Sequence, residues 1–223
     1  MKLAVDHVVV ASRRLDEGVA WCEAMLGVTP GPGGKHVFMG THNRLFRIAS
    51  ARFPQAYLEI IAIDPAAPAP ARLRWFDLDS PAMQATLASG PRLVHWVARV
   101  DDIASTHAAA ATAGAACGEV LEAQRETAKG LLSWRITVRP DGCLLCGGAM
   151  PTLIEWRGSH PSDSMPHSGI ELLALSVKGV PAWMLAGFPA GVGPSLTQAS
   201  APLSVTLDTP RGVVRLYAPD MAR

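Results

Sequence analysis

Four ionisable residues of this chain, two histidines and two glutamates, each stand at the centre of a short apolar run. They are His7 in VDHVVV, Glu59 in YLEII, His95 in LVHWV and Glu155 in TLIEW. Such runs are typical of buried strands, where an uncompensated charge is costly. Imidazole nitrogens and carboxylate oxygens are ligands that Zn²⁺, Mn²⁺, Ni²⁺ and Fe²⁺ accept. The four residues therefore predict a divalent metal site.

An ion held by two imidazoles and two carboxylates keeps one or two positions open to water or substrate, as catalytic sites do. It could polarise a carbonyl or enolate oxygen and lower the pKa of its bound water. One glutamate, Glu59 or Glu155, could then leave the ion and act as general base. The alternative is a pocket that keeps the four groups in a polar network without metal.

Alternation along each strand predicts that the four groups share one surface. Residues two apart lie on the same face of a strand. Val8 and Val10 must meet an amphipathic helix, so His7 points away from that helix. The other three groups likewise oppose their apolar neighbours, which are Leu58, Ile60, Val94, Trp96, Ile154 and Trp156. We therefore expect His7, Glu59, His95 and Glu155 to face one concave surface.

The order of predicted elements is βαβββ, and it occurs twice. In the first copy we expect the elements at residues 2–10, 15–26, 37–39, 44–50 and 57–63. In the second copy we expect them at residues 92–100, 101–113, 118–123, 131–138 and 152–156. A repeated unit makes the ionisable positions equivalent in pairs.

The expected fold is α+β, with two tandem βαβββ modules that share a cleft. The modules are residues 1–64 and 92–160, and residues 65–91 form a linker with a short helix. Residues 168–223 form a C-terminal β-rich extension, an incomplete third module placed to cover the cleft.

Polar residues on neighbouring strands are candidates for substrate binding. Parity places Asn43 and Arg47 on the cleft side, and Arg135 occupies the corresponding position in the second copy. Two arginines could clamp a carboxylate or phosphate, which predicts a small, oxygen-rich, anionic substrate. Exposed strand arginines are the alternative. His42, in an expected turn, is a further candidate, and four histidines are expected to be solvent-exposed: His36, His107, His160 and His167.

Composition gives no sign of a nucleic-acid or membrane partner. The formal net charge is +1 over 223 residues, and the chain has no apolar run of about 18 residues. It begins without a signal-peptide pattern, and its four cysteines are too scattered for a disulfide framework, so we expect a cytoplasmic protein. Cys143 and Cys146 have redox or zinc-knuckle spacing but no matching second pair.

The pattern resembles the vicinal oxygen chelate superfamily, and most closely its glyoxalase-like branch. The likeness spans roughly residues 2–157 and rests on LAVDHVVV at 3–10, GTHN at 40–43 and YLEIIAIDP at 57–65. The resemblance implies paired βαβββ modules and metal ligands from the first and last strands of each module. Here those ligands would be His7, Glu59, His95 and Glu155.

The resemblance implies isomerase, lyase, epimerase or dioxygenase chemistry on vicinal oxygens. The chain has no obvious glutathione-recognition motif, and some superfamily members bind ligands without metal. Two classes of function therefore stay open: a metal-dependent enzyme, and a metal-free protein that binds or sequesters a small ligand. Both modules lie in one chain, so a site needs no partner, although a homodimer that exchanges modules would keep the same ligands.

Overall fold

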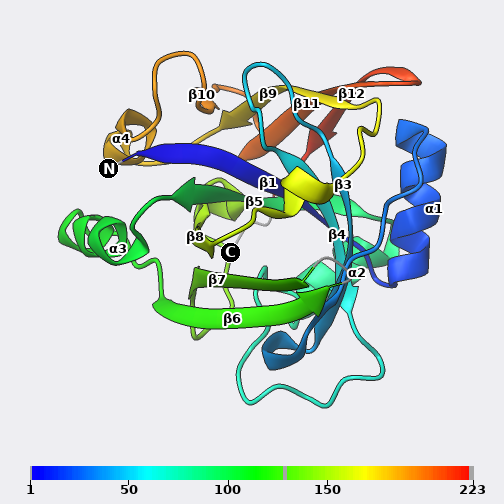
Figure 1. Cartoon of the computed structure of the whole chain (residues 1–223), viewed down its shortest axis with the longest axis horizontal. Helices are drawn as coiled ribbons and strands as arrows, with labels where there is room; N and C mark the ends of the chain where they lie inside the picture. Colours follow the sequence, from blue (N-terminus) through cyan, green and yellow to red (C-terminus); the bar gives the residue numbers. More distant parts are fainter. Residues whose placement is uncertain (1, 128–129, 221–223) are drawn as a thin grey trace.

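The computed structural model of the chain describes residues 2–127 and 130–220 (Figure 1). Eight strands form one strongly curved, nearly closed mixed sheet in the order β2-β3-β4-β1-β5-β8-β7-β6. Its first four strands are β1 (Leu3–Ala11), β2 (Lys35–His36), β3 (Thr41–Arg47) and β4 (Tyr57–Ile63). Its last four are β5 (Arg92–Val100), β6 (Glu119–Thr127), β7 (Gly130–Val138) and β8 (Thr152–Arg157).

A second sheet of four strands follows in the order β10-β9-β11-β12. Its strands are β9 (Glu171–Val177), β10 (Ser195–Leu196), β11 (Leu203–Thr209) and β12 (Gly212–Tyr217). The α-helices are α1 (Leu15–Leu26), α2 (Pro81–Ala88), α3 (Ile103–Thr112) and α4 (Ala182–Ala186). Short 3₁₀ turns are η1 (Val37–Met39), η2 (Cys146–Gly148) and η3 (Pro161–Ser164).

The two βαβββ units meet along β1 and β5, which pair antiparallel at the centre of the large sheet. Within each unit the first and last strands pair parallel, β1 with β4 and β5 with β8. Helix α1 ends at Gly27, whose φ of 77° is left-handed. The carboxylate of Asp102 accepts the N–H groups of Ala104 and Ser105 and so caps α3. Both helix boundaries agree with the sequence pattern.

Two elements differ from expectation around residues 35–43. The strand expected at 37–39 is η1, in which Met39 is buried and Val37 is exposed. Residues 41–43 of the expected turn at 40–43 are instead the start of β3. The chain already turns at Gly40, which adopts a left-handed φ of 58°. As a consequence, His42 lies within a strand and not in the expected turn.

The concave face of the large sheet is partly filled by the linker. Trp75, Phe76, Leu78, Met83 and Leu87 form one apolar core with inward-facing residues of the central strands, namely Val9, Ile61, Val94, Val97 and Ile154. Phe76 and Asp77 both have left-handed φ values, 62° and 56°, which non-glycine residues rarely adopt. The linker is therefore an integral part of the hydrophobic core on the concave face.

The C-terminal sheet covers the convex face, so the expectation that this extension covers the cleft is wrong. Leu172, Leu175, Leu203, Val205 and Leu207 pack in one core with Val8, Val10, Trp96 and Ala98 of the central strands. These strands are apolar on both faces, and the extension supplies the cover that the outer face requires.

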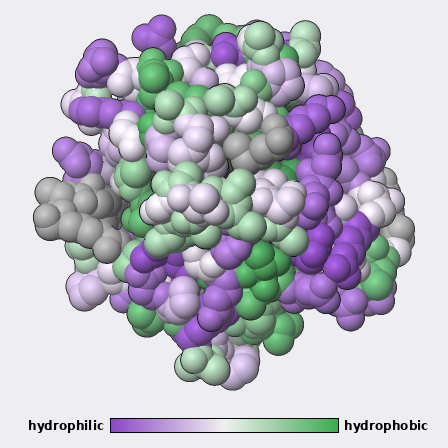
Figure 2. All heavy atoms as spheres, turned by 90° about the vertical axis from the view of Figure 1, so that its left-hand side faces the viewer, coloured by the Kyte–Doolittle hydropathy of each residue, from purple (hydrophilic) through white to green (hydrophobic). Residues whose placement is uncertain are grey.

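The face that carries α3 and α4 is shown in Figure 2, where polar and apolar side chains are interspersed. Within the described residues, no helix combines the length and apolarity needed to cross a membrane. All four cysteines are free thiols.

Candidate active site

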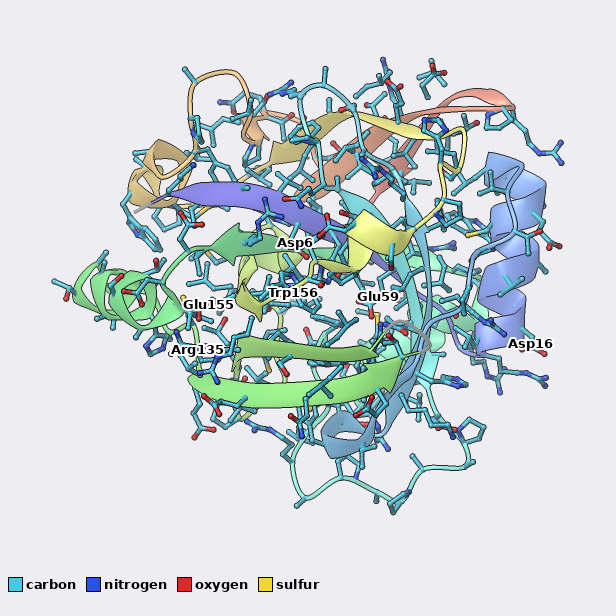
Figure 3. All side chains as sticks on the ribbon, viewed as in Figure 1. Asp6, Asp16, Glu59, Arg135, Glu155 and Trp156 are labelled. Carbon is cyan, nitrogen blue, oxygen red and sulfur yellow. The ribbon has the colours of Figure 1, made fainter. Side chains whose placement is uncertain are left out.

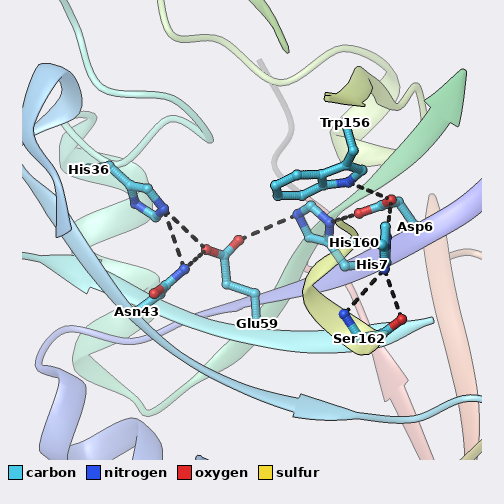
Figure 4. Close-up of polar contacts among 8 residues, drawn as sticks. All are labelled: Asp6, His7, His36, Asn43, Glu59, Trp156, His160 and Ser162. Atoms are coloured by element: carbon cyan, nitrogen blue, oxygen red, sulfur yellow. Dashed lines mark hydrogen bonds and ion pairs between the residues drawn. The ribbon is translucent and has the colours of Figure 1, made fainter. Parts of the chain in front are cut away.

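Strand β1 delivers Asp6 and His7 to the interior of the molecule (Figure 4). The pairing of β1 with β5 has an irregularity between Val5 and His7. Val5 therefore packs in the outer core, whereas His7 stacks on Tyr57 with ring centroids 4.5 Å apart. Asp6 has no exposed surface and His7 is 6% exposed, so both are held away from bulk water.

Asp6 accepts three hydrogen bonds from side chains. The donors are Nδ1 of His7 at 2.7 Å, Nε2 of His160 at 2.9 Å and Nε1 of Trp156 at 3.0 Å. The backbone N–H of Ser162 donates to Nδ1 of His160 (3.2 Å), so it is Nε2 of His160 that carries a proton toward Asp6. Burial alone would raise the pKa of Asp6, but the bonds from His160 and His7 overcome it and lower that pKa well below its ordinary value. Asp6 is therefore a buried carboxylate.

His7 stands between this carboxylate and a second one. Because Nδ1 of His7 is directed at Asp6, Nε2 faces the other way, toward Oε2 of Glu59 at 3.6 Å. This distance is too long for a hydrogen bond. An imidazole nitrogen and a carboxylate oxygen at this separation can both contact one polar group of a ligand. The pair therefore has the composition of an acid–base couple.

Asn43 fixes the other end of Glu59. Its Nδ2 donates to Oε1 of Glu59 at 2.6 Å, and its Oδ1 accepts the backbone N–H of Gly34 at 2.8 Å. The amide orientation is thus set by two bonds on opposite sides. Asn43 Nδ2 also lies 3.3 Å from Nε2 of His36, and burial lowers the pKa of His36 to about 4. A neutral His36 accepts from Asn43, so Oε2 of Glu59 is left to face His7.

Three predicted site residues therefore lie together on the concave side: His7, Glu59 and Asn43. Their parity is the predicted one, because Leu58 and Ile60 pack in the outer core. Glu59 is 5% exposed, so this carboxylate is nearly enclosed.

Glu155 and Arg135 do not join them, and the expectation that both face the cleft is wrong (Figure 3). Arg135 pairs with Glu155 (Nη2 to Oε1, 2.6 Å), and the other carboxylate oxygen accepts the N–H of Ile103 at the start of α3 (2.8 Å). Ile154 and Trp156 face the concave side in their place. Apolar residues lie on both faces of β8, so the sequence pattern could not tell which face turned inward.

His95 faces the concave side as predicted, but both of its ring nitrogens are bonded within the protein. Thr152 donates its backbone N–H to Nε2 at 3.0 Å, so Nδ1 carries the proton and donates to the carbonyl of Gly148 at 3.2 Å. Burial lowers the pKa of His95 to about 3. His95 thus holds the segment that leads into β8 as a neutral imidazole.

The predicted set of four ligands does not fit a single ion. Glu155 lies on the convex side of the sheet, and the lone pair of His95 is already used by Thr152. Across residues 2–127 and 130–220, no group of three or more histidine, cysteine, aspartate or glutamate side chains has the arrangement of a metal site.

Two predicted substrate contacts are also placed elsewhere. His42 pairs with Ala62 across β3 and β4, one step out of phase with Asn43, and therefore lies on the convex side. Arg47 lies on the concave side, but its guanidinium donates to the backbone carbonyls of Ser162 (3.4 Å) and Pro54 (3.3 Å). Arg47 and Arg135 lie on opposite faces of the sheet, so they cannot clamp one anion.

Several residues of this site were not found from the sequence. His36 and His160 were expected to be exposed, yet they are 7% and 6% exposed. Asp6 carried a signal, because it is a second ionisable group in the first apolar run. His160 and Arg125 carried none, since each reaches the site from a segment distant in the sequence, with bonds to Asp6 and Asn43.

Comparisons with known proteins agree with this fold. A family model described as "Glyoxalase-like domain" matches residues 5–186. A hypothetical protein from Staphylococcus aureus superposes with a TM-score of 0.57 and 13% identity, over 98% of this chain and 87% of that one. At such low identity this likeness concerns the fold. A search of the curated proteins found no match.

Two methylmalonyl-CoA epimerase structures are also similar. One, in complex with methylmalonyl-CoA and NH4+, has a TM-score of 0.46 and 19% identity, over 74% of this chain and all of that chain. A variant from Streptomyces coelicolor, in complex with 2-nitronate-propionyl-CoA, has a TM-score of 0.45 and 17% identity, over 70% of this chain and 96% of that one.

Proposed function

Since the chain belongs to the glyoxalase-like domain family, we propose that its concave face binds a small, oxygen-rich carbonyl compound and moves a proton on the carbon beside the carbonyl. The observation that carries this proposal is the couple of His7 Nε2 and Glu59 Oε2, which face each other at 3.6 Å. Each member is held from behind, His7 by Asp6 and Glu59 by Asn43. Groups fixed in this way lose little freedom when they react.

In the proposed reaction Glu59 is the base. Its Oε2 takes the proton from carbon, the C–H electron pair forms a C–C double bond, and the carbonyl electrons move to oxygen. His7, with protons on both ring nitrogens, donates from Nε2 to the enolate oxygen, and Asp6 stabilises the imidazolium through Nδ1. When His7 takes its proton back from the enol oxygen, Glu59 returns a proton to the same carbon, which gives proton exchange. Where that carbon carries a hydroxyl, His7 takes the hydroxyl proton instead and Glu59 delivers its proton to the former carbonyl carbon, which gives an isomerase reaction. No step runs through a metal ion, since the predicted ligands do not converge.

The test is proton exchange in heavy water, with 2-oxobutyrate as the first probe and loss of its C3 proton signal followed by NMR. We expect the wild-type protein to catalyse exchange and Glu59→Gln to slow it by about 100-fold or more, the usual contribution of a general base. Glu171→Gln, an exposed glutamate on β9, is the matched control and should exchange at the wild-type rate. Equal rates in Glu59→Gln and the wild type would rule out the proposed base.

A metal-free binding protein is the second candidate, favoured by the enclosure of the site. The linker residues Trp75 and Phe76 occupy the concave face beside it, and Glu59 is nearly buried. A binding protein would give saturable binding of the probe with no exchange in any variant. Calorimetry beside the exchange assay therefore separates the two functions.

A further inference from the structure

Arg125 reaches the candidate site from the far edge of the sheet. Leu121 and Ala123 of β6 pack against the apolar core on the concave face of the large sheet. By alternation Arg125 lies on the same face. Its Nη1 is 3.3 Å from Oδ1 of Asn43 on β3, although β6 and β3 lie at opposite ends of the strand order. Arg125 therefore brings a positive charge to the residue that holds Glu59.

This charge is poorly compensated. In the described part of the chain no carboxylate lies within ion-pair distance of Arg125, whereas Arg135 has Glu155. Its contact with Asn43 is weak, because that oxygen already accepts the Gly34 N–H at the shorter distance of 2.8 Å. The Nε of Arg125 is buried without a hydrogen-bond partner among the same residues. A buried N–H donor in this state is unfavourable unless an acceptor joins it.

A second donor without a partner among the described residues, the indole N–H of Trp75, lies beside His36. The ring of Trp75 meets that of His36 edge to face, with centroids 5.0 Å apart. Its indole Nε1 is buried, and no described residue accepts from it. His36 in turn contacts Asn43. The Trp75 indole is therefore linked to Asn43 through His36.

We infer that Arg125 binds a carboxylate of the substrate, with Trp75 as a second donor, so that the site selects small 2-oxo or 2-hydroxy acids. This inference rests on the proposed function. Asn43 touches both Glu59 and Arg125, so one short side chain links the proposed base to the proposed carboxylate-binding residue. A guanidinium suits a carboxylate because it offers two parallel donors. Arg125 thus has the role predicted for Arg47 and Arg135.

The test compares binding of 2-oxobutyrate with that of its neutral amide, measured by calorimetry. We expect the wild type to bind the acid at least about tenfold more tightly than the amide, and Arg125→Met to lose this preference, since a hydrogen bond to a charged group contributes roughly ten- to a hundredfold. Arg125→Lys should keep part of the preference for the acid. Trp75→Phe should weaken the binding of the acid severalfold. Arg215→Met, an exposed arginine on β12, should match the wild type.

Equal binding of acid and amide by the wild type, an unchanged preference in Arg125→Met, or no binding of either probe would each overturn the inference. The exchange assay keeps the two proposals separate. If Arg125→Met loses the preference while no variant exchanges protons, carboxylate recognition stands and the catalytic role of Glu59 fails. If exchange depends on Glu59 but is equal for acid and amide, the catalytic role of Glu59 stands and carboxylate recognition by Arg125 fails.

Discussion

Arg135 and Glu155 form a two-point ion pair on the convex side of the large sheet, with Nε and Nη2 of Arg135 3.1 and 2.6 Å from the same carboxylate oxygen. The second oxygen accepts the N–H of Ile103, the first residue of α3. Glu155 therefore joins strand β8 to the start of a helix, which is a structural role and not that of a ligand or base.

This arrangement predicts a stability effect without a functional one. We expect Glu155→Gln to lower the free energy of unfolding by about 1–2 kcal/mol, because the ion pair and the bond to Ile103 are weakened on a partly exposed surface. Urea unfolding measures the free energy of unfolding. The exchange assay and metal analysis of the purified protein show whether function changes, and we expect both to match the wild type. A change in metal content in Glu155→Gln would contradict the placement of this carboxylate.

Asp6→Asn should be the most damaging single substitution near the site. The amide keeps the volume but removes the charge, and it turns one acceptor of Asp6 into a donor that faces the N–H of His160, His7 or Trp156. Breaking such a buried network costs about 3–5 kcal/mol, measured as the shift in urea unfolding. Asp208→Asn, an exposed aspartate on β11, is the control. If Asp6→Asn lowered the free energy of unfolding no more than the control does, the three hydrogen bonds to Asp6 would contribute nothing to stability.

Two buried histidines predict a loss of stability in acid. Burial lowers the pKa of His36 to about 4 and of His95 to about 3, from 6.5. Below pH 6.5 the unfolded chain takes up protons that the folded chain does not. Stability is therefore complete above that pH and falls as the pH drops toward 4 and then 3. Each histidine adds about 1.4 kcal/mol per pH unit to this slope.

Urea unfolding at a series of pH values measures that slope. His36→Gln should reduce it by the share of one histidine. An identical slope in His36→Gln and the wild type would contradict a neutral, buried His36.

Gly34 and Gly33 offer a graded test of the Arg125 contact. A Cβ on Gly34 would lie 2.6 Å from Nη1 of Arg125, the mobile end of a side chain. Gly34→Ala should therefore displace Arg125, cost little stability and reduce the preference for the acid probe severalfold. A Cβ on Gly33 would lie 2.0 Å from the backbone oxygen of Asn43, which cannot move aside, so Gly33→Ala should destabilise the fold itself. If Gly34→Ala keeps the full preference, the guanidinium position is not what selects the ligand.

The sequence by itself determined the elements and much of the site. Apolar runs ended by glycine, proline or charge give strands and helices directly, because each signal is local. Alternation also placed His7, Glu59 and Asn43 on the concave side, since α1 needs an apolar strand surface beneath it. The repeated βαβββ order followed from these same local patterns.

Only the tertiary structure decided which groups complete that site. The central strands are buried on both faces, so alternation has no polar side to mark it, and β8 could turn Glu155 or Trp156 inward. The bonds of Asp6 to His160 and of Asn43 to Arg125 join residues 154 and 82 positions apart. Such contacts depend on how the curved sheet brings its edges and loops together, and no local pattern records that closure.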